Sequence, residues 1–294
     1  MRILRILVLL FAAGVLVAGQ EPMRRVVYVM ALDNKGAPIT DLTAADFEVK
    51  EGGKAREIIR VEPALGKLQI AILVDDNGTG FFRVAVARFI ESLLGRAEFS
   101  ISTVEGQMLK LVDYTTETRD LSEAVQRLSA RPATNGGGQL LDGIVETSQD
   151  MAKRKAGRPI IVALTVGGPD VTPIQPDYAL NELRKSGAAL HVVSVLSSAM
   201  AQSATQGKAS DMIGEGHALS AMLGDGPRRS GGHREEISAM AGVTTGLHVL
   251  ADQLKQQYLL EYSLAGANPS DRVSISVKRK GVTLRAPTYV PDKF

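Results

Sequence analysis

The sequence contains no cysteine and no tryptophan, and aromatic residues make up only 4% of it. Without cysteine, thiol catalysis, cysteine-ligated zinc and lipid attachment through a cysteine are excluded. The shortage of aromatic rings argues against a groove that stacks sugars or nucleobases. We therefore expect no nucleic-acid partner.

Signatures of catalysis are also missing. The four histidines stand far apart, without a His-Glu-x-x-His pattern. There is no Gly-x-Ser-x-Gly motif, and the glycine run 136–138 lacks the Lys-Ser/Thr ending of a phosphate-binding loop. A hydrolase using Asp75, Asp76 or Asp170 would need a nucleophile–base pair that the sequence does not offer. We expect a protein that is not an enzyme and has no organic cofactor.

The N-terminus has the pattern of a secretory signal. Arg2 and Arg5 precede the apolar run 6–17, which is short for a bilayer span, and small residues follow at 17–19. Residues 1–19 are thus predicted to be a signal peptide, with an uncleaved anchor as the alternative. Its loss would reduce 34 basic residues to 32, against 32 acidic ones, which leaves little electrostatic attraction for phosphates. We expect a secreted or periplasmic protein without a stable membrane span.

Strands and helices alternate from residue 67 onward. Nearly continuous apolar runs predict strands buried on both faces, at 68–74, 159–165 and 188–195. Apolar residues at helical spacing predict intervening helices at 81–94, 140–155 and 177–186. Two further strands are expected at 98–104 and 108–114. This order predicts an α/β fold with a doubly wound, mostly parallel, Rossmann-like sheet.

The flanking segments are expected to be β-rich. A small N-terminal β element is predicted for 20–65 and a C-terminal β extension for 266–294, which leaves 66–265 as the α/β domain. Within it, the Gly- and Ser-rich stretch 197–233 is expected to be a surface insertion, with a helix near 217–223 and a flexible run from 224 to 232. Residues 234–241 are expected to be helical. His191 falls in a predicted buried strand and is expected to be a core histidine with its hydrogen bonds satisfied.

A polar turn follows the first buried strand. In open α/β sheets, ligands bind beyond the carboxyl ends of the strands, where strand order reverses. There, oxygen atoms of Asp75, Asn77 and Thr79 could converge on one hard cation, Mg²⁺ or Ca²⁺. The alternative is a glycine-rich turn whose Asp and Asn only cap the next helix.

Three stretches, at 36–49, 73–75 and 253–262, occur in the order found in one family: Gly-Ala-Pro-Ile-Thr-Asp-Leu-Thr-Ala-Ala-Asp-Phe-Glu-Val, Leu-Val-Asp and Gln-Leu-Lys-Gln-Gln-Tyr-Leu-Leu-Glu-Tyr. With them the chain resembles the von Willebrand factor A (VWA) family, and more closely the VWFA-related family of acidobacterial exported proteins. The resemblance implies a VWA fold and a protein-binding module. Its recognition face would be formed by the loops 75–82, 133–142 and 166–176.

The resemblance also implies a cation site, the metal-ion-dependent adhesion site (MIDAS), built from three parts. The first, Asp-x-Ser-x-Ser, is here Asp75-x-Asn77-x-Thr79. The threonine of the second part falls at Gly138 and the aspartate of the third at Val166, neither of which can ligate. Asp170 would compensate only if its loop folds back. We therefore predict a degenerate site, with an Mg²⁺- or Ca²⁺-dependent adhesin that still uses Asp75, Asn77 and Thr79 as the alternative.

Overall fold

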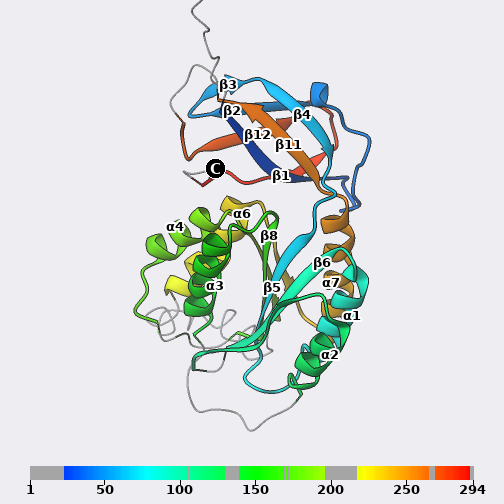
Figure 1. Cartoon of the computed structure of the whole chain (residues 1–294), viewed down its shortest axis with the longest axis vertical. Helices are drawn as coiled ribbons and strands as arrows, with labels where there is room; N and C mark the ends of the chain where they lie inside the picture. The colour runs from blue at the N-terminus through cyan, green and yellow to red at the C-terminus, as the bar shows by residue number, and fades with distance from the viewer. Residues whose placement is uncertain are drawn as a thin grey trace, which may run out of the picture.

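The computed structural model describes residues 23–104, 106–129, 139–167, 170, 172–195, 217–264 and 269–291. They form an α/β module and a β module that lie one above the other (Figure 1). The predicted signal peptide 1–19 lies outside the described residues. Among the described helices, none has the length and apolar character needed to cross a membrane.

The α/β module alternates strands and helices along the chain. Its strands are β5 Leu68–Asp75, β6 Ala97–Val104, β7 Met108–Thr115, β8 Pro159–Thr165, β9 Ala189–Val195 and β10 Arg234–Ile237. Its helices are α1 Arg83–Leu93, α2 Thr118–Gln126, α3 Leu140–Arg154, α4 Pro176–Ser186, α6 His217–Ser230 and α7 Met240–Lys255. The strand order is β10-β9-β8-β5-β6-β7. All neighbours are parallel except β6 and β7. The expected doubly wound, mostly parallel α/β fold is confirmed.

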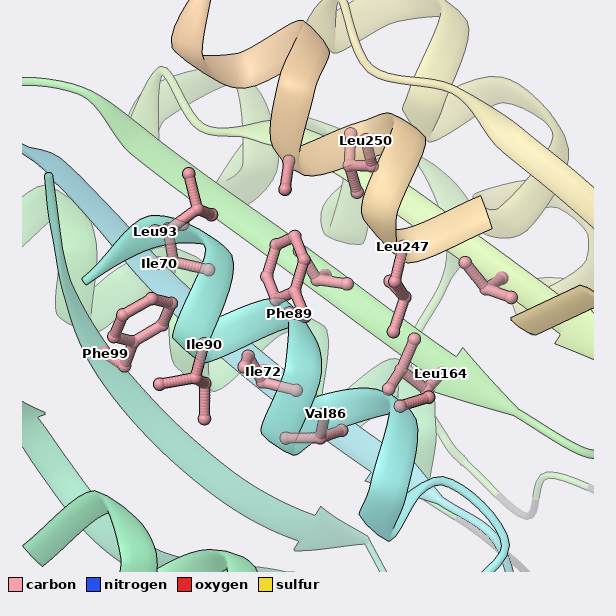
Figure 2. Packing of buried hydrophobic residues seen from close by; sticks show 14 of the residues in the cluster. Ile70, Ile72, Val86, Phe89, Ile90, Leu93, Phe99, Leu164, Leu247 and Leu250 are labelled. Atoms are coloured by element: carbon pink, nitrogen blue, oxygen red, sulfur yellow. The ribbon is translucent and has the colours of Figure 1, made fainter. Parts of the chain in front are cut away.

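Burial on both faces explains the long apolar strands. Every residue of β8 is buried, and in β5 only Gln69 and Asp75 are partly exposed. On one face of the sheet, α1, α2 and α7 contribute to one apolar cluster, while α3, α4 and α6 contribute to a second cluster on the other. Figure 2 shows Phe89 of α1 in the first cluster, together with Leu247 and Leu250 of α7.

The helix expected near 217–223 is present as α6, but it continues to Ser230, and Arg234–Ile237 also differs from the sequence expectation. Arg234–Ile237, predicted to be helical, is the edge strand β10, which pairs in parallel with β9. Helix α6 occupies the end of the proposed insertion and buries Met222 among α3, α4 and β9. A Cβ at Gly226 would approach the Leu190 side chain to 2.9 Å, so this glycine permits close packing within a helix. Residues 196–216 lie outside the described residues.

The β module draws strands from both ends of the chain. Its strands are β1 Arg24–Leu32, β2 Phe47–Glu51, β3 Lys54–Arg56, β4 Ile58–Pro63, β11 Tyr258–Ser263, β12 Val273–Val277 and β13 Thr283–Arg285, with a short helix η1 at Ala44–Asp46. One sheet has the order β13-β1-β11-β4 and the other β12-β2-β3. The segments assigned to 20–65 and 266–294 thus share both sheets, and β11 pairs with β1 and β4.

A buried ion pair fastens the two ends of the chain inside the β module. Arg25 Nη1 donates to Glu51 Oε2 over 2.7 Å, and both side chains are buried. The Tyr262 hydroxyl donates to the same Glu51 oxygen over 2.7 Å, and the Ser270 amide donates to the other over 2.8 Å. Every oxygen of this buried carboxylate has a donor, as a buried charge requires.

Candidate functional site

The strand order reverses between β5 and β8, and the two strands end side by side. Asp75 closes β5 directly opposite Thr165, which closes β8. The Thr165 hydroxyl donates to Asp75 Oδ2 over 2.7 Å and accepts the Gly167 amide over 2.9 Å. The Val166 amide donates to the Asp75 carbonyl over 3.0 Å. Side-chain and backbone bonds therefore tie together the first residues of two loops at the switch point.

The turn after Asp75 is organised by its neighbour, Asp76. Asp76 is buried, and its Oδ1 accepts the Gly78 amide over 3.1 Å. The Thr79 amide and hydroxyl both donate to the Asp76 carbonyl, over 3.1 and 2.9 Å. Asn77 is exposed with a φ of 52°, in the left-handed region that asparagine tolerates. The turn is thus an Asx turn, the pattern that an aspartate before Asn-Gly favours.

The candidate ligands do not point to one place. Thr79 Oγ1 is engaged with the Asp76 carbonyl and accepts the Phe81 amide over 3.3 Å, and Asn77 faces solvent. The buried carboxylate is Asp76, whose Oδ2 has no hydrogen-bond partner in the described part of the chain. Sequence spacing singled out Asp75, because the family pattern begins there. The Asx turn is the one sequence signal that distinguishes Asp76.

Asp170 folds back onto the start of α3. Its Oδ2 accepts the Leu141 amide over 3.2 Å, and the residue is 1% exposed. Burial raises the pKa of the Asp170 carboxyl to about 6, although the amides of Leu140 and Leu141 act in the opposite direction. The nearby Asp142 carboxylate raises it further. The loop therefore returns to the sheet end, where Asp170 caps a helix.

These donors do not fit a resident divalent cation. Ca²⁺ takes six to eight oxygen ligands and Mg²⁺ needs near-octahedral geometry, usually with carboxylates. In the described ranges, no three Asp, Glu, His or Cys side chains gather in a way that could hold a metal. At the position of the family's third part, Val166 offers only an apolar side chain. Gly138, at the second part, lies outside the described residues.

The proposed recognition loops are described to different extents. The loop 75–82 is described throughout, whereas 133–138, 168, 169 and 171 lie outside the described residues.

His191 is a core residue, 1% exposed, and burial lowers the pKa of its imidazole to about 3. Neither ring nitrogen has a hydrogen-bond partner among the described residues. His191 is therefore buried as expected, but the expected hydrogen bonds are not present among these residues.

Comparison with known proteins gives distant structural similarities only. No protein-family model matches the chain. No curated protein matches it either. One similar structure is proximal thread matrix protein 1 from the mussel byssus, with a zinc-occupied MIDAS motif, at 13% identity and a TM-score of 0.44. The match covers 73% of this chain and 50% of that one.

Two other similar structures come from bacteria. A von Willebrand factor type A protein from Catenulispora acidiphila matches at 11% identity over 92% of this chain and 74% of that one, with a TM-score of 0.45. The vWF domain of the type V pili tip protein Mfa5 from Porphyromonas gingivalis matches at 11% identity over 65% and 96%, with a TM-score of 0.43. At such identities no residue role is transferred to this chain.

Proposed function

We propose that the chain is an exported, non-enzymatic, VWA-like protein-binding module that recognises its partner without a resident cation. The recognition face is formed by the loops 75–82, 133–142 and 166–176. The observation that carries this proposal is the hydrogen bond from Thr165 to Asp75. It joins two of these loops at the switch point of the sheet, so that the protein's own groups hold the platform in place.

The same bond argues against catalysis at this position. A threonine hydroxyl donating to a carboxylate has the form of a nucleophile and its base. Thr165, however, is 2% exposed, and its oxygen also accepts the Gly167 amide. A substrate carbonyl cannot approach an oxygen that is enclosed in this way. The pair is therefore suited to holding loops together.

Capture of partners from an envelope extract tests the proposal. The protein would be immobilised in Mg²⁺ buffer and, separately, in EDTA, beside the variants Thr79→Arg and Thr283→Arg. Both substitutions add the same cation to an exposed threonine, but Thr283 lies in β13 of the β module. We expect the same partner with and without Mg²⁺, loss of capture in Thr79→Arg, and normal capture in Thr283→Arg. Normal capture by Thr79→Arg would contradict the proposed face.

One observation favours the second candidate, an Mg²⁺- or Ca²⁺-dependent adhesin. The buried Oδ2 of Asp76, next to Asp75, has no hydrogen-bond partner in the described part of the chain, and a cation would satisfy it. Thermal unfolding with and without Mg²⁺, repeated on Asp75→Ala, separates the candidates. An Mg²⁺-induced rise in Tm that disappears in Asp75→Ala would establish the adhesin, together with loss of partner capture in EDTA. Insensitivity to Mg²⁺ would exclude it.

A further inference from the structure

A cleft of about 690 Å³ lies between the two modules, at the amino ends of β8 and β9. It is lined by β1, by the segments that follow α3 and α4, and by residues 287–291 near the end of the chain. Its volume is within the 300–1,000 Å³ of typical small-molecule sites, which often occur at domain interfaces. The cleft is at the opposite end of the sheet from the loops 75–82 and 166–176, since those loops follow the carboxyl ends of the strands.

Arg158 is a buried cation in the wall of this cleft. It is 5% exposed, and its guanidinium carbon lies 5.3 Å from the centre of the Tyr28 ring. Its hydrogen bonds reach only neutral oxygen atoms, namely the carbonyls of Ala64, Gly66 and Leu254 and the side-chain amide of Gln257. Its Nε has no partner among the described residues. Buried charges are normally paired, but among the described residues no carboxylate pairs with this one.

The rest of the lining adds positive charge and apolar surface. Lys155 and Lys185 also line the cleft, and no Asp or Glu does so in the described part of the chain. Lys185 is paired with Glu182 over 2.6 Å, but no described carboxylate pairs with the exposed Lys155. The other walls are largely apolar, as at Val26, Met151 and Ile160. An occupant that suits these walls combines an apolar body with one negative charge.

We propose that this cleft is a binding site for an amphipathic carboxylate, a linear apolar chain with a single anionic head. The apolar chain lies against the walls contributed by β1 and β8. The carboxylate faces Lys155 within the field of the Arg158 charge, with which no carboxylate of the described residues is paired. The site is independent of the recognition loops and of any cation.

Calorimetric titration of decanoate into the whole protein tests this site. Acetate carries the same head without the chain, and decyltrimethylammonium carries the same chain with the opposite charge. We expect saturable 1:1 binding of decanoate, no measurable binding of acetate, and binding of the cationic probe that is at least about tenfold weaker. The variant Asp292→Asn is titrated in parallel, because Asp292 is an acidic residue that follows the cleft-lining Pro291 in the sequence. We expect decanoate to bind to this variant as well.

Two pairs of variants locate the binding. Gly157 lines the cleft, and a Cβ there would meet nothing within 4 Å, so Gly157→Phe adds a large side chain to the cleft wall at a position with room for its Cβ. Gly224 in α6 has equally open surroundings and does not line the cleft, which makes Gly224→Phe the control. Lys155 has a φ of 54°, which asparagine tolerates, so Lys155→Asn removes the charge and shortens the side chain without straining the backbone. Lys153→Asn is its control.

We expect Gly157→Phe to lower decanoate affinity at least about tenfold and Lys155→Asn about threefold, with both controls unchanged. Arg158 is left intact in these tests, because its bonds hold three separate segments of the chain. The proposal is overturned if decanoate does not saturate, if it binds no better than decyltrimethylammonium, or if Gly157→Phe binds it normally.

Discussion

Clusters of opposite charge lie at the two ends of the central sheet. At the carboxyl end lie Asp75, Asp76, Asp142 and Asp170, and at the amino end lie Lys155, Arg158 and Lys185. Helix dipoles explain part of this division, because the helices of βαβ units run antiparallel to the strands. Their amino ends therefore lie beside the carboxyl ends of the strands. Asp142 and Asp177 occupy the first turns of α3 and α4, and basic residues occupy their last turns.

Two buried charges are not explained by helix dipoles. Arg158 belongs to no helix, and the nearby oxygens that it contacts are neutral. Asp76 belongs to a turn, and one of its oxygens has no partner in the described part of the chain. Glu51 in the β module shows the usual arrangement, in which a buried charge has a full set of partners. The unmatched charges at the two sheet ends therefore mark the places where ligands or partners are expected.

The largest effect is expected at the amino end. Arg158→Met should lower the free energy of unfolding by about 4 kcal/mol, because it leaves up to three buried oxygens without a donor. Arg154→Met is the control, since its partners Asp113 and Asp150 are exposed and such pairs contribute about 1 kcal/mol or less. Urea unfolding at pH 7 measures both. Equal losses in the two variants would show that the buried hydrogen bonds of Arg158 contribute no more to stability than an exposed ion pair.

A pH-dependent effect is expected at the carboxyl end. The folded pKa of Asp170, about 6, is above its ordinary value of 3.8. As the pH rises from 4 to 6, the unfolded chain loses this proton first, so Asp170 progressively destabilises the fold. Above pH 6 the cost amounts to about 2 to 3 kcal/mol. At pH 4 most of this cost is absent, because the pH is then close to the ordinary pKa of 3.8.

Asp170→Asn removes this titration and keeps an oxygen for the Leu141 amide. The variant should be more stable than the native chain at pH 7.5 and nearly equal to it at pH 4, as measured by urea unfolding at both values. Asp177→Asn, in the first turn of α4, is the control for loss of an acidic residue near a helix start. A difference from the native chain that stays constant between pH 4 and 7.5 would contradict the assigned pKa.

A smaller loss is expected from Thr165→Val, which keeps the shape of the side chain and removes the hydroxyl that joins the two loops. The free energy of unfolding should fall by about 2 kcal/mol, since the lost bond is to a charged group. Thr283→Val, in an exposed strand, should leave it unchanged. Urea unfolding distinguishes the two. If Thr165→Val is as stable as the native chain, the bond does not hold the platform.

Periodicity predicted most of the α/β module, because β5 and β8 are buried on both faces and α1 on one. It failed for β10, whose sequence Arg-Glu-Glu-Ile has no apolar pattern and which becomes a strand only through its pairing with β9. Periodicity also failed for 224–227, which lie within helix α6. The glycine at 226 is required by close packing against the side chain of Leu190, which comes from a strand distant in the sequence.

The candidate site could be predicted only in part. The position of Asp75 at the switch point follows from the strand pattern and the family resemblance. The burial of Asp76 and the return of Asp170 to α3 depend on tertiary contacts that spacing along the chain does not encode. The cleft at Arg158 has no sequence signal, because its walls come from six separate parts of the chain, including 26–28 and 287–291.

Calorimetric titration of Mg²⁺ into the native chain and into the double variant Gly138→Thr/Val166→Asp tests the central claim, recognition without a resident cation. This variant introduces a hydroxyl and a carboxylate at the two positions that the family resemblance assigns to the missing parts of the cation site. We expect no binding heat with the native chain and saturable 1:1 binding with the variant. Saturable binding of Mg²⁺ to the native chain, abolished by Asp75→Ala, would contradict the account.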